Sequence, residues 1–285
     1  MKLILSPYHL KSHPGWAFVS LATNGLLVLV LAWVLPAGQH HYSLPPSVSY
    51  PPATVGISPM PNLWSDLGPR HQLSYRQWLN LLRREAEAIA SQKPENLTVL
   101  IGDSLSLWFP QEMLPQGQTW LNQGISGETS AGLLKRLYLL DRTKPKVIFV
   151  MIGINDLIGG ARNETILANQ RLIVRNLRQN YPQAEIVLQS ILPHSAGSVT
   201  WEGRELLMSI PNSRIQYLNQ RSQEMALKEG VIFLDLYPLF ANTEGDLRAE
   251  LSTDGLHLSE QGYVVWSNAL QVLGQVLLNG GVGSR

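Results

Sequence analysis

The stretch TVLIGDSLS, Thr98 to Ser106, passes directly from an aliphatic run into Gly-Asp-Ser. The aliphatic run is typical of a buried strand. The residues after it have two interpretations: a turn in which Asp103 or Ser104 caps a helix, or a nucleophile placed beyond the end of a strand. The choice depends on whether other segments supply a base, an orienting acid and donors for an oxyanion.

Strand and helix patterns alternate along the rest of the chain. Apolar runs predict five strands, at residues 98–101, 119–122, 146–152, 185–191 and 231–236. Helical spacing of apolar residues predicts helices at about 75–89, 130–140, 164–179, 213–228 and 260–278. Aliphatic strands bounded by helices indicate a parallel sheet covered on both faces. Because ligands of such sheets bind beyond the carboxyl ends of the strands, the residues that follow each strand are the candidate site.

Those positions carry the groups that acyl transfer needs. Ser104 is the candidate nucleophile, and His257 is the candidate base that takes its proton. Asp254 precedes His257 by three residues across a glycine-containing turn, which can bring its carboxylate to one ring nitrogen and leave the other facing Ser104. The backbone N–H groups of Ser104 and Gly127 and the side-chain amide of Asn155 are the candidate oxyanion donors.

Each segment taken alone also has a purely structural interpretation. The segments that hold Gly127 and Asn155 could be strand-to-helix turns, and Ser259 could cap the last helix. Asp156 is expected to brace its turn and not to react. His194, which follows the fourth strand, either lines the substrate pocket or has a packing or solvated role, and we favour the second.

Together, four short blocks resemble those of the SGNH hydrolases, also called GDSL esterases and lipases. They read GDSLS at 102–106, GISGET at 124–129, GIND at 153–156 and DGLH at 254–257, in the order found in that family. The resemblance covers about residues 97–278. It implies a flavodoxin-like three-layer α/β/α sandwich with a five-stranded parallel sheet.

The resemblance also implies an activity: a serine esterase or lipase that cleaves carboxylic esters without a metal or cofactor. It assigns Ser104 as nucleophile, His257 as base and Asp254 as the residue that orients the base. Ser104, Gly127 and Asn155 form the implied oxyanion hole. Two alternatives stay open: an O-acyltransferase that uses the same triad on envelope glycans, and a catalytically silent binding module on the same fold.

The second block departs from the family pattern. Many members have Asp where this chain has Glu128, and the extra methylene could change how the loop is braced. Gly127 is chosen over Gly124 as the oxyanion residue because the family glycine precedes the acidic residue. After His257, Leu258 and Ser259 replace the Pro-Asn of many members, a change that does not touch the triad.

Other function classes lack their signatures. The 285 residues carry a net charge of +1, which gives no electrostatic basis for a nucleic-acid partner. The absence of cysteine excludes thiolate catalysis and cysteine-ligated zinc. The sequence has neither a GxSxG nucleophile elbow, nor an HExxH zinc helix, nor a phosphate-binding loop. The expected partner is a small-molecule, lipid or carbohydrate ester.

The N-terminal segment has the composition of a membrane anchor. Residues 16–35 contain no charged side chain and have about the length that crosses a bilayer as a helix. Lys2 and Lys11 precede this segment, and the next cationic residue is Arg70, which predicts a cytoplasmic N-terminus and an extracytoplasmic domain. The alternative is a secreted protein whose signal peptide is cleaved near Leu35–Ala37.

The predicted organisation is therefore a cytoplasmic end, a single-pass anchor, a linker and one enzyme domain. Seven prolines between residues 36 and 61 predict an extended linker that holds the domain off the membrane. The predicted boundaries are 1–14, 15–36, 37–70 and 71–285.

Overall fold

Five short segments, most of them apolar, form the strands of one parallel sheet in the computed structural model of the chain, which describes residues 73–195 and 204–280. The predicted cytoplasmic end, membrane anchor and linker lie outside these residues. Among the helices that the structure describes, none combines the length and the apolar character needed to cross a bilayer.

The five strands confirm the predicted sheet. They are β1 (Leu97–Gly102), β2 (Thr119–Gly124), β3 (Val147–Met151), β4 (Glu185–Gln189) and β5 (Ile232–Leu234). Their order across the sheet is β2-β1-β3-β4-β5, and every neighbouring pair is parallel. This is the flavodoxin-like order. The connections leave β1 and β3 in opposite directions across the sheet, and ligands of such sheets bind in the crevice at the carboxyl ends of these two strands.

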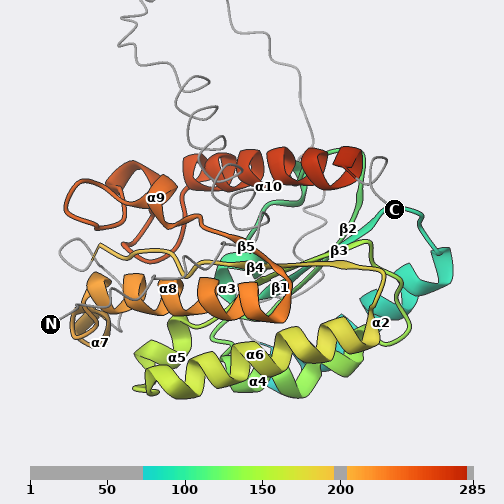
Figure 1. Cartoon of the computed structure of the whole chain (residues 1–285), viewed down its shortest axis with the longest axis horizontal. Coiled ribbons are helices and arrows are strands. Elements are labelled where there is room, and N and C mark those ends of the chain that lie inside the picture. The colour runs from blue at the N-terminus through green and yellow to red at the C-terminus, as the bar shows by residue number, and fades with distance from the viewer. Residues whose placement is uncertain (1–72, 196–203, 281–285) are drawn as a thin grey trace, which may run out of the picture. The chain divides into compact units, whose positions relative to one another are not determined.

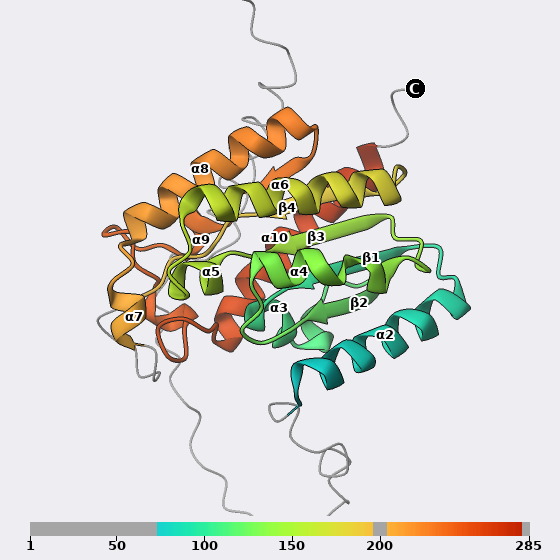
Figure 2. The same ribbon diagram turned by 90° about the horizontal axis from the view of Figure 1, so that it is seen from below.

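Helices cover both faces of the sheet. Figure 1 shows α10 above the sheet and α4, α6 and α8 below it, and Figure 2 shows the lower layer from outside, with α2 beside β2. The helix bounds are α2 Tyr75–Gln92, α3 Ser104–Leu107, α4 Ser130–Arg136, α5 Ile154–Ile158, α6 Asn163–Asn180, α7 Arg204–Met208, α8 Asn212–Glu229, α9 Tyr237–Phe240 and α10 Glu260–Gly280.

Alternation along the central strands explains the layers. Val99 and Ile101 of β1 and Ile148 and Val150 of β3 are fully buried and join one core cluster. That cluster also contains apolar residues of the lower helices: Leu133, Ile173, Leu177, Met225 and Ala226. Because β3 is buried along its whole length, it reads in the sequence as a continuous aliphatic run.

The structure differs from the prediction in short elements near the strand ends. α3 and α5 begin shortly after β1 and β3, in segments that the sequence marks as possible helix-initiating turns but for which it predicts no helix bounds. A helix of one turn shows no 3.6-residue periodicity, so apolar spacing cannot reveal it. The helix predicted at 130–140 ends at Arg136 and continues as a 3-10 turn, Leu137–Leu140.

Candidate active site

Ser104 is the first residue of α3, immediately beyond the carboxyl end of β1. Asp103 is the N-cap of this helix, and its Oδ1 accepts the backbone N–H of Leu105 at 3.0 Å. A Cβ on Gly102 would lie 2.3 Å from the carbonyl oxygen of Met151, so a glycine is needed where β1 and β3 approach. The first interpretation of the opening stretch is therefore confirmed: Asp103 caps a short helix, and Ser104 lies just beyond the carboxyl end of β1.

The structure brings Ser104, His257 and Asp254 into one hydrogen-bonded row. Ser104 Oγ lies 3.1 Å from His257 Nε2, and His257 Nδ1 lies 2.7 Å from Asp254 Oδ2. The other carboxylate oxygen, Oδ1, accepts the backbone N–H groups of Leu256 at 2.9 Å and of His257 at 2.7 Å. The three-residue spacing thus folds as a tight loop that fixes both the carboxylate and the ring.

The hydrogen bonds determine the charge of Asp254. Partial burial by itself would raise the pKa of this carboxyl, but the hydrogen bonds from the His257 side chain and from two backbone N–H groups outweigh it and lower the pKa. Since an ionised carboxylate only accepts hydrogen bonds, the ring hydrogen is assigned to Nδ1. His257 Nε2 is then an acceptor for the hydroxyl of Ser104.

A turn at Ile125–Glu128 follows β2, whose last residue, Gly124, pairs with Gly102 at the end of β1. The N–H of Glu128 donates to the carbonyl of Ile125 at 3.2 Å, and Gly127 has φ +74° within this turn. An added Cβ on Gly127 would meet no atom within 4 Å, so its glycine is required by backbone conformation and not by space. Gly124 differs, since its Cβ would lie 2.3 Å from the backbone nitrogen of Leu107.

Asn155 and Asp156 join this turn to the end of β3. The side-chain Nδ2 of Asn155 donates to the carbonyl of Glu128 at 3.1 Å, which uses one of its two amide hydrogens. The carboxylate of Asp156 accepts the backbone N–H of Ser130 at 2.7 Å and its hydroxyl at 2.5 Å. Asp156 therefore braces α5 against α4, whereas the sequence predicted a brace within its own turn.

A buried ion pair supports the same turn and explains the departure at Glu128. Glu128 Oε2 lies 2.5 Å from Arg136 Nε, and Arg136 Nη2 also donates to the carbonyl of Gly102 at 3.1 Å. Burial lowers the pKa of Arg136. A Cβ at Gly132 would lie 1.9 Å from Glu128 Oε1, so the absence of a side chain there makes room for the longer acid. Arg136 thereby links the turn of Gly127 to the end of β1, two residues before Ser104.

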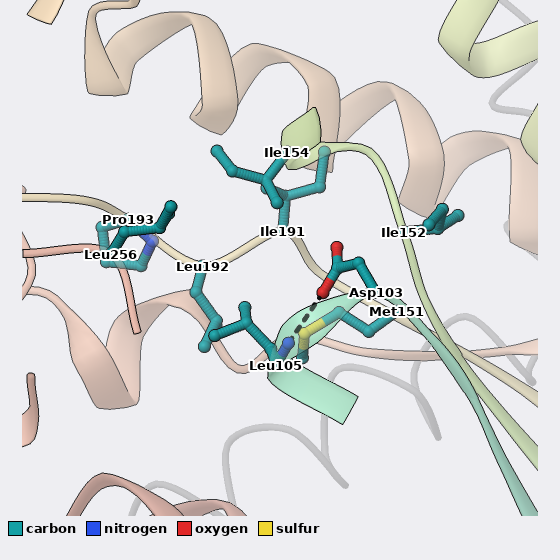
Figure 3. Close-up of a pocket in the computed structure, with 9 residues that line it drawn as sticks. All are labelled: Asp103, Leu105, Met151, Ile152, Ile154, Ile191, Leu192, Pro193 and Leu256. Atoms are coloured by element: carbon teal, nitrogen blue, oxygen red, sulfur yellow. Dashed lines mark hydrogen bonds between the residues drawn. The ribbon is translucent and has the colours of Figure 1, made fainter. Parts of the chain in front are cut away.

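A small apolar cavity lies beside the triad. It encloses about 10 Å³, close to the least volume that holds one water molecule. Figure 3 shows its lining: Asp103, Leu105, Met151, Ile152, Ile154, Ile191, Leu192, Pro193 and Leu256. The lining includes Leu105, which follows Ser104 in the chain, and Leu256, which precedes His257, but neither Ser104 nor His257 itself.

Asp103 is the only ionisable residue among those that line this cavity. Its side chain is almost fully buried, and its Oδ2 has no hydrogen-bond partner among the described residues. Burial, with a smaller contribution from the charge of Asp156, raises the pKa of Asp103 from 3.8 to about 7, against the hydrogen bond from Leu105. The folded chain therefore favours the acid form of this side chain over the ionised form.

We expect Asp103→Asn to change how stability depends on pH. In the wild type, the preference for the acid form stabilises the fold below pH 3.8 and is lost as pH rises through about 7. The raised pKa corresponds to about 4 kcal/mol, an order-of-magnitude figure. Asparagine does not titrate, so the free energy of unfolding of the variant should gain on the wild type between pH 4 and pH 8. Urea unfolding at several pH values measures this difference, and a difference that stays constant with pH would refute the assignment.

His194 lies outside the hydrogen-bonded row, in a structural position. It is buried, its Nε2 lies 2.7 Å from the carbonyl oxygen of Ile210, and its backbone N–H donates to Asn212. Burial lowers its pKa. His194 is absent from the lining of the cavity described above, in agreement with the favoured interpretation. No group of three or more His, Asp or Glu residues within 73–195 and 204–280 is placed to hold a metal ion.

The sequence did not predict two contacts of the site. Trp108 packs its ring against His257, with ring centroids 4.1 Å apart, and Arg136 braces the turn of Gly127. Only the position of Trp108, four residues after Ser104, could have suggested in the sequence that its side chain lies near the site. Arg136 falls on an apolar helical pattern, where a buried cation has no sequence signature.

Comparison with known proteins identifies the family of the chain. Residues 102–265 match the profile of the GDSL-like lipase/acylhydrolase family. The platelet-activating factor acetylhydrolase IB subunit alpha1 of Bos taurus is 29% identical over 208 residues, which cover 69% of this chain and 82% of that protein. The corresponding human protein is 28% identical with the same coverage.

Solved structures show the same fold. A structure from Streptococcus pneumonia is 30% identical, with a TM-score of 0.56, and the match covers 70% of this chain and 95% of that one. A GDSL-like lipase from Bacteroides thetaiotaomicron has a TM-score of 0.57 over 71% of this chain and 99% of its own, at 20% identity. The second match shows likeness of fold alone.

Proposed function

The chain belongs to the GDSL-like lipase/acylhydrolase family and is an ester hydrolase, and from this premise we propose that it cleaves short-chain carboxylic esters through an acyl-enzyme on Ser104. The observation that carries the proposal is the row of contacts from Ser104 Oγ through both nitrogens of His257 to Asp254. A serine hydroxyl is a weak nucleophile until a base takes its proton, and this row supplies the base and its orientation.

In the first half of the reaction, Ser104 Oγ attacks the carbonyl carbon of the ester. His257 Nε2 takes the hydroxyl proton, and the ionised Asp254 stabilises the imidazolium that forms. The carbonyl electrons move to the oxygen, which becomes an oxyanion. When the tetrahedral intermediate collapses, the bond to the alcohol oxygen breaks and that oxygen receives the proton from His257.

The oxyanion would be held by the backbone N–H groups of Ser104 and Gly127 and by the side chain of Asn155. One amide hydrogen of Asn155 already bonds to the carbonyl of Glu128, which fixes the plane of the amide and leaves the second hydrogen for the oxyanion. Preorganised donors of this kind are usually the largest single contribution to such reactions. Glu128 and Arg136 act behind them by fixing the turn.

The second half of the reaction releases the acid. A water molecule gives its proton to His257 and attacks the acyl carbon, and collapse of the new intermediate returns the proton to Ser104 Oγ. The cycle needs only water as a co-reactant, so the residues of this chain account for every proton transfer. An alcohol acceptor in place of water would give the acyltransferase alternative.

The apolar cavity supports a short acyl group. Its lining includes Leu105 and Leu256, the chain neighbours of Ser104 and His257, and its volume of about 10 Å³ suits a group of the size of a methyl. A longer chain would have to displace closely packed side chains, which costs about 1–3 kcal/mol. The acetylhydrolases among the relatives agree with this reading. We therefore propose acetyl esters as the preferred substrates.

Leu192→Ala is expected to broaden the acyl preference. Leu192 lines the cavity, and its truncation should raise the ratio of kcat/KM for butyryl over acetyl esters about 10-fold, since a methylene in an apolar pocket is worth about that much. A panel of esters with graded acyl length measures the ratio on the full chain. Because it is a ratio, it does not depend on the fraction of folded protein.

Leu188→Ala is the matched control for this experiment. Leu188 lies in β4, shortly before Leu192 in the chain, and is fully buried. Its side chain belongs to the core cluster below the sheet and does not line the cavity. Its ratio should equal that of the wild type. An unchanged ratio in Leu192→Ala would show that the acyl group binds elsewhere. Analysis of the products separates hydrolysis, which gives free acid, from transfer, which gives an acylated acceptor.

The proposal includes a location outside the cytoplasm, with the domain anchored in the membrane. It is supported by the uncharged segment at residues 16–35 and by the cationic residues that precede it. Release of the chain from membranes by an alkaline carbonate wash would contradict the anchor and favour the secreted alternative.

A further inference from the structure

We propose that Trp108 is a positioning residue for His257: its ring fixes the imidazole toward Ser104 and stabilises the positive charge that the imidazole carries during the reaction. The inference rests on the proposed function, since it assumes that His257 is the base. The starting observation is the contact between the two rings, whose centroids lie 4.1 Å apart with an interplanar angle of 32°. Cation–π attraction operates within about 6 Å of a ring centroid.

Both ring nitrogens of the imidazole already have hydrogen-bond partners, so a further contact that stabilises the ring must lie on its face. Nε2 faces Ser104 and Nδ1 faces Asp254, and both contacts lie in the plane of the ring. Trp108 packs on the face instead. His257 is only 8% exposed, so water solvates the charge poorly when the ring is protonated. The indole is therefore well placed to offset part of that lost solvation.

The backbone of Trp108 is tied to the nucleophile. Trp108 is the C-cap of α3, and its N–H donates to the carbonyl of Ser104 at 2.9 Å. A one-turn helix thus presents the nucleophile at its start and the indole at its end. The imidazole of His257 contacts Ser104 and Trp108, so this one short helix can fix the position and the orientation of the imidazole.

A buried aromatic cluster anchors this short helix to α10. The next residue, Phe109, packs on Tyr263 and Trp266, with ring centroids 5.1 Å and 5.0 Å apart. The hydroxyl of Tyr263 donates to the carbonyl of Leu105 at 3.0 Å. These contacts hold α3 rigidly, whereas Trp108 itself is 37% exposed. Because the side chain of Trp108 is partly exposed, the fold should tolerate a substitution there.

The test compares Trp108→Phe and Trp108→Leu in the full chain. Phenylalanine keeps an aromatic face, and leucine keeps an apolar side chain without one. We expect leucine to lower kcat by about 2- to 30-fold, with phenylalanine closer to the wild type, because the attraction at stake has that size. Asp254 is the charged group that contacts the imidazole, and it is unchanged in both variants.

The dependence of kcat/KM on pH gives a readout that loss of packing would not move. If the indole stabilises the protonated imidazole, its removal makes the proton easier to lose, so the acid limb of the profile in Trp108→Leu should move about 0.5 to 1 pH unit lower. In Trp108→Phe the limb should move less. Titration of the reactive serine with a fluorophosphonate normalises each rate to the fraction of active chain.

Two results would overturn the inference. One is a Trp108→Leu variant with wild-type kcat and an unmoved acid limb. The other is an equal loss of kcat in both variants with no movement of the limb, which would reduce Trp108 to a filler of space. Failure of the proposed function looks different, because the fluorophosphonate would then leave Ser104 unlabelled in the wild type as well.

Discussion

Ser104→Ala is expected to lower kcat for acetyl ester hydrolysis by about 10⁵- to 10⁶-fold, the size seen when the nucleophile of a serine triad is removed. Without Ser104 Oγ there is no atom to form the acyl-enzyme, and His257 loses the hydroxyl that lies 3.1 Å from its Nε2. The residual rate should come from the oxyanion donors acting on direct attack by water. The release of acid or alcohol from an acetyl ester measures the effect.

Ser106→Ala is the matched control for that variant. Ser106 lies two residues further along the same short helix and is completely buried, and its Oγ has no hydrogen-bond partner among the described residues. The substitution removes the same atom from the same element without touching His257. Its kcat should stay within a few-fold of the wild type. Full activity in Ser104→Ala would refute the mechanism, whatever the control shows.

Asp254→Asn is expected to lower kcat about 10⁴-fold while leaving the fold intact. An amide has almost the shape of the carboxylate, and its oxygen can still accept the backbone N–H groups of Leu256 and His257. Its nitrogen would then face Nδ1 of the ring and demand an acceptor there. That arrangement moves the ring hydrogen to Nε2, which can no longer take the proton of Ser104.

Asp235→Asn is the control for this variant. It shows whether replacing any acidic residue that follows a strand lowers kcat, or only Asp254. Asp235 follows β5, is partly buried and accepts the backbone N–H of Tyr237 at 3.2 Å, much as Asp254 accepts backbone groups of its own loop. It contacts no member of the triad. The expected kcat is close to that of the wild type. A comparable loss in both variants would mean that Asp254 acts on stability and not on the base.

Aliphatic runs such as the one in β3 were enough to predict the sheet, because a strand buried on both faces must be apolar at every position. The flavodoxin-like fold was implied by the resemblance of four blocks to a known family, and the observed order β2-β1-β3-β4-β5 agrees with that fold. The approach of Ser104, His257 and Asp254 was predictable as well, since the carboxyl ends of parallel strands meet at one edge. The structure adds the distances: 3.1 Å from Ser104 Oγ to His257 Nε2, and 2.7 Å from His257 Nδ1 to Asp254 Oδ2.

The features that the sequence did not reveal arise from tertiary packing. Trp108 meets His257 only because α3 and the loop before α10 are brought together by the aromatic cluster around Trp266. The volume of the cavity depends on how side chains from four separate segments fit, and no local pattern encodes it. Arg136 reaches both Glu128 and Gly102 across two elements. In each case the deciding contact joins residues distant in the chain.

The central claim is that Ser104 is the single nucleophile, and labelling with a fluorophosphonate tests it most directly. The full chain is treated with increasing probe, and the remaining esterase activity is plotted against the number of probe molecules bound per chain. We predict that activity falls in proportion to labelling, reaches zero at one probe per chain, and that the label lies on Ser104 in the digested protein. Hydrolysis that persists in fully labelled protein, or a label on any other residue, would contradict the account.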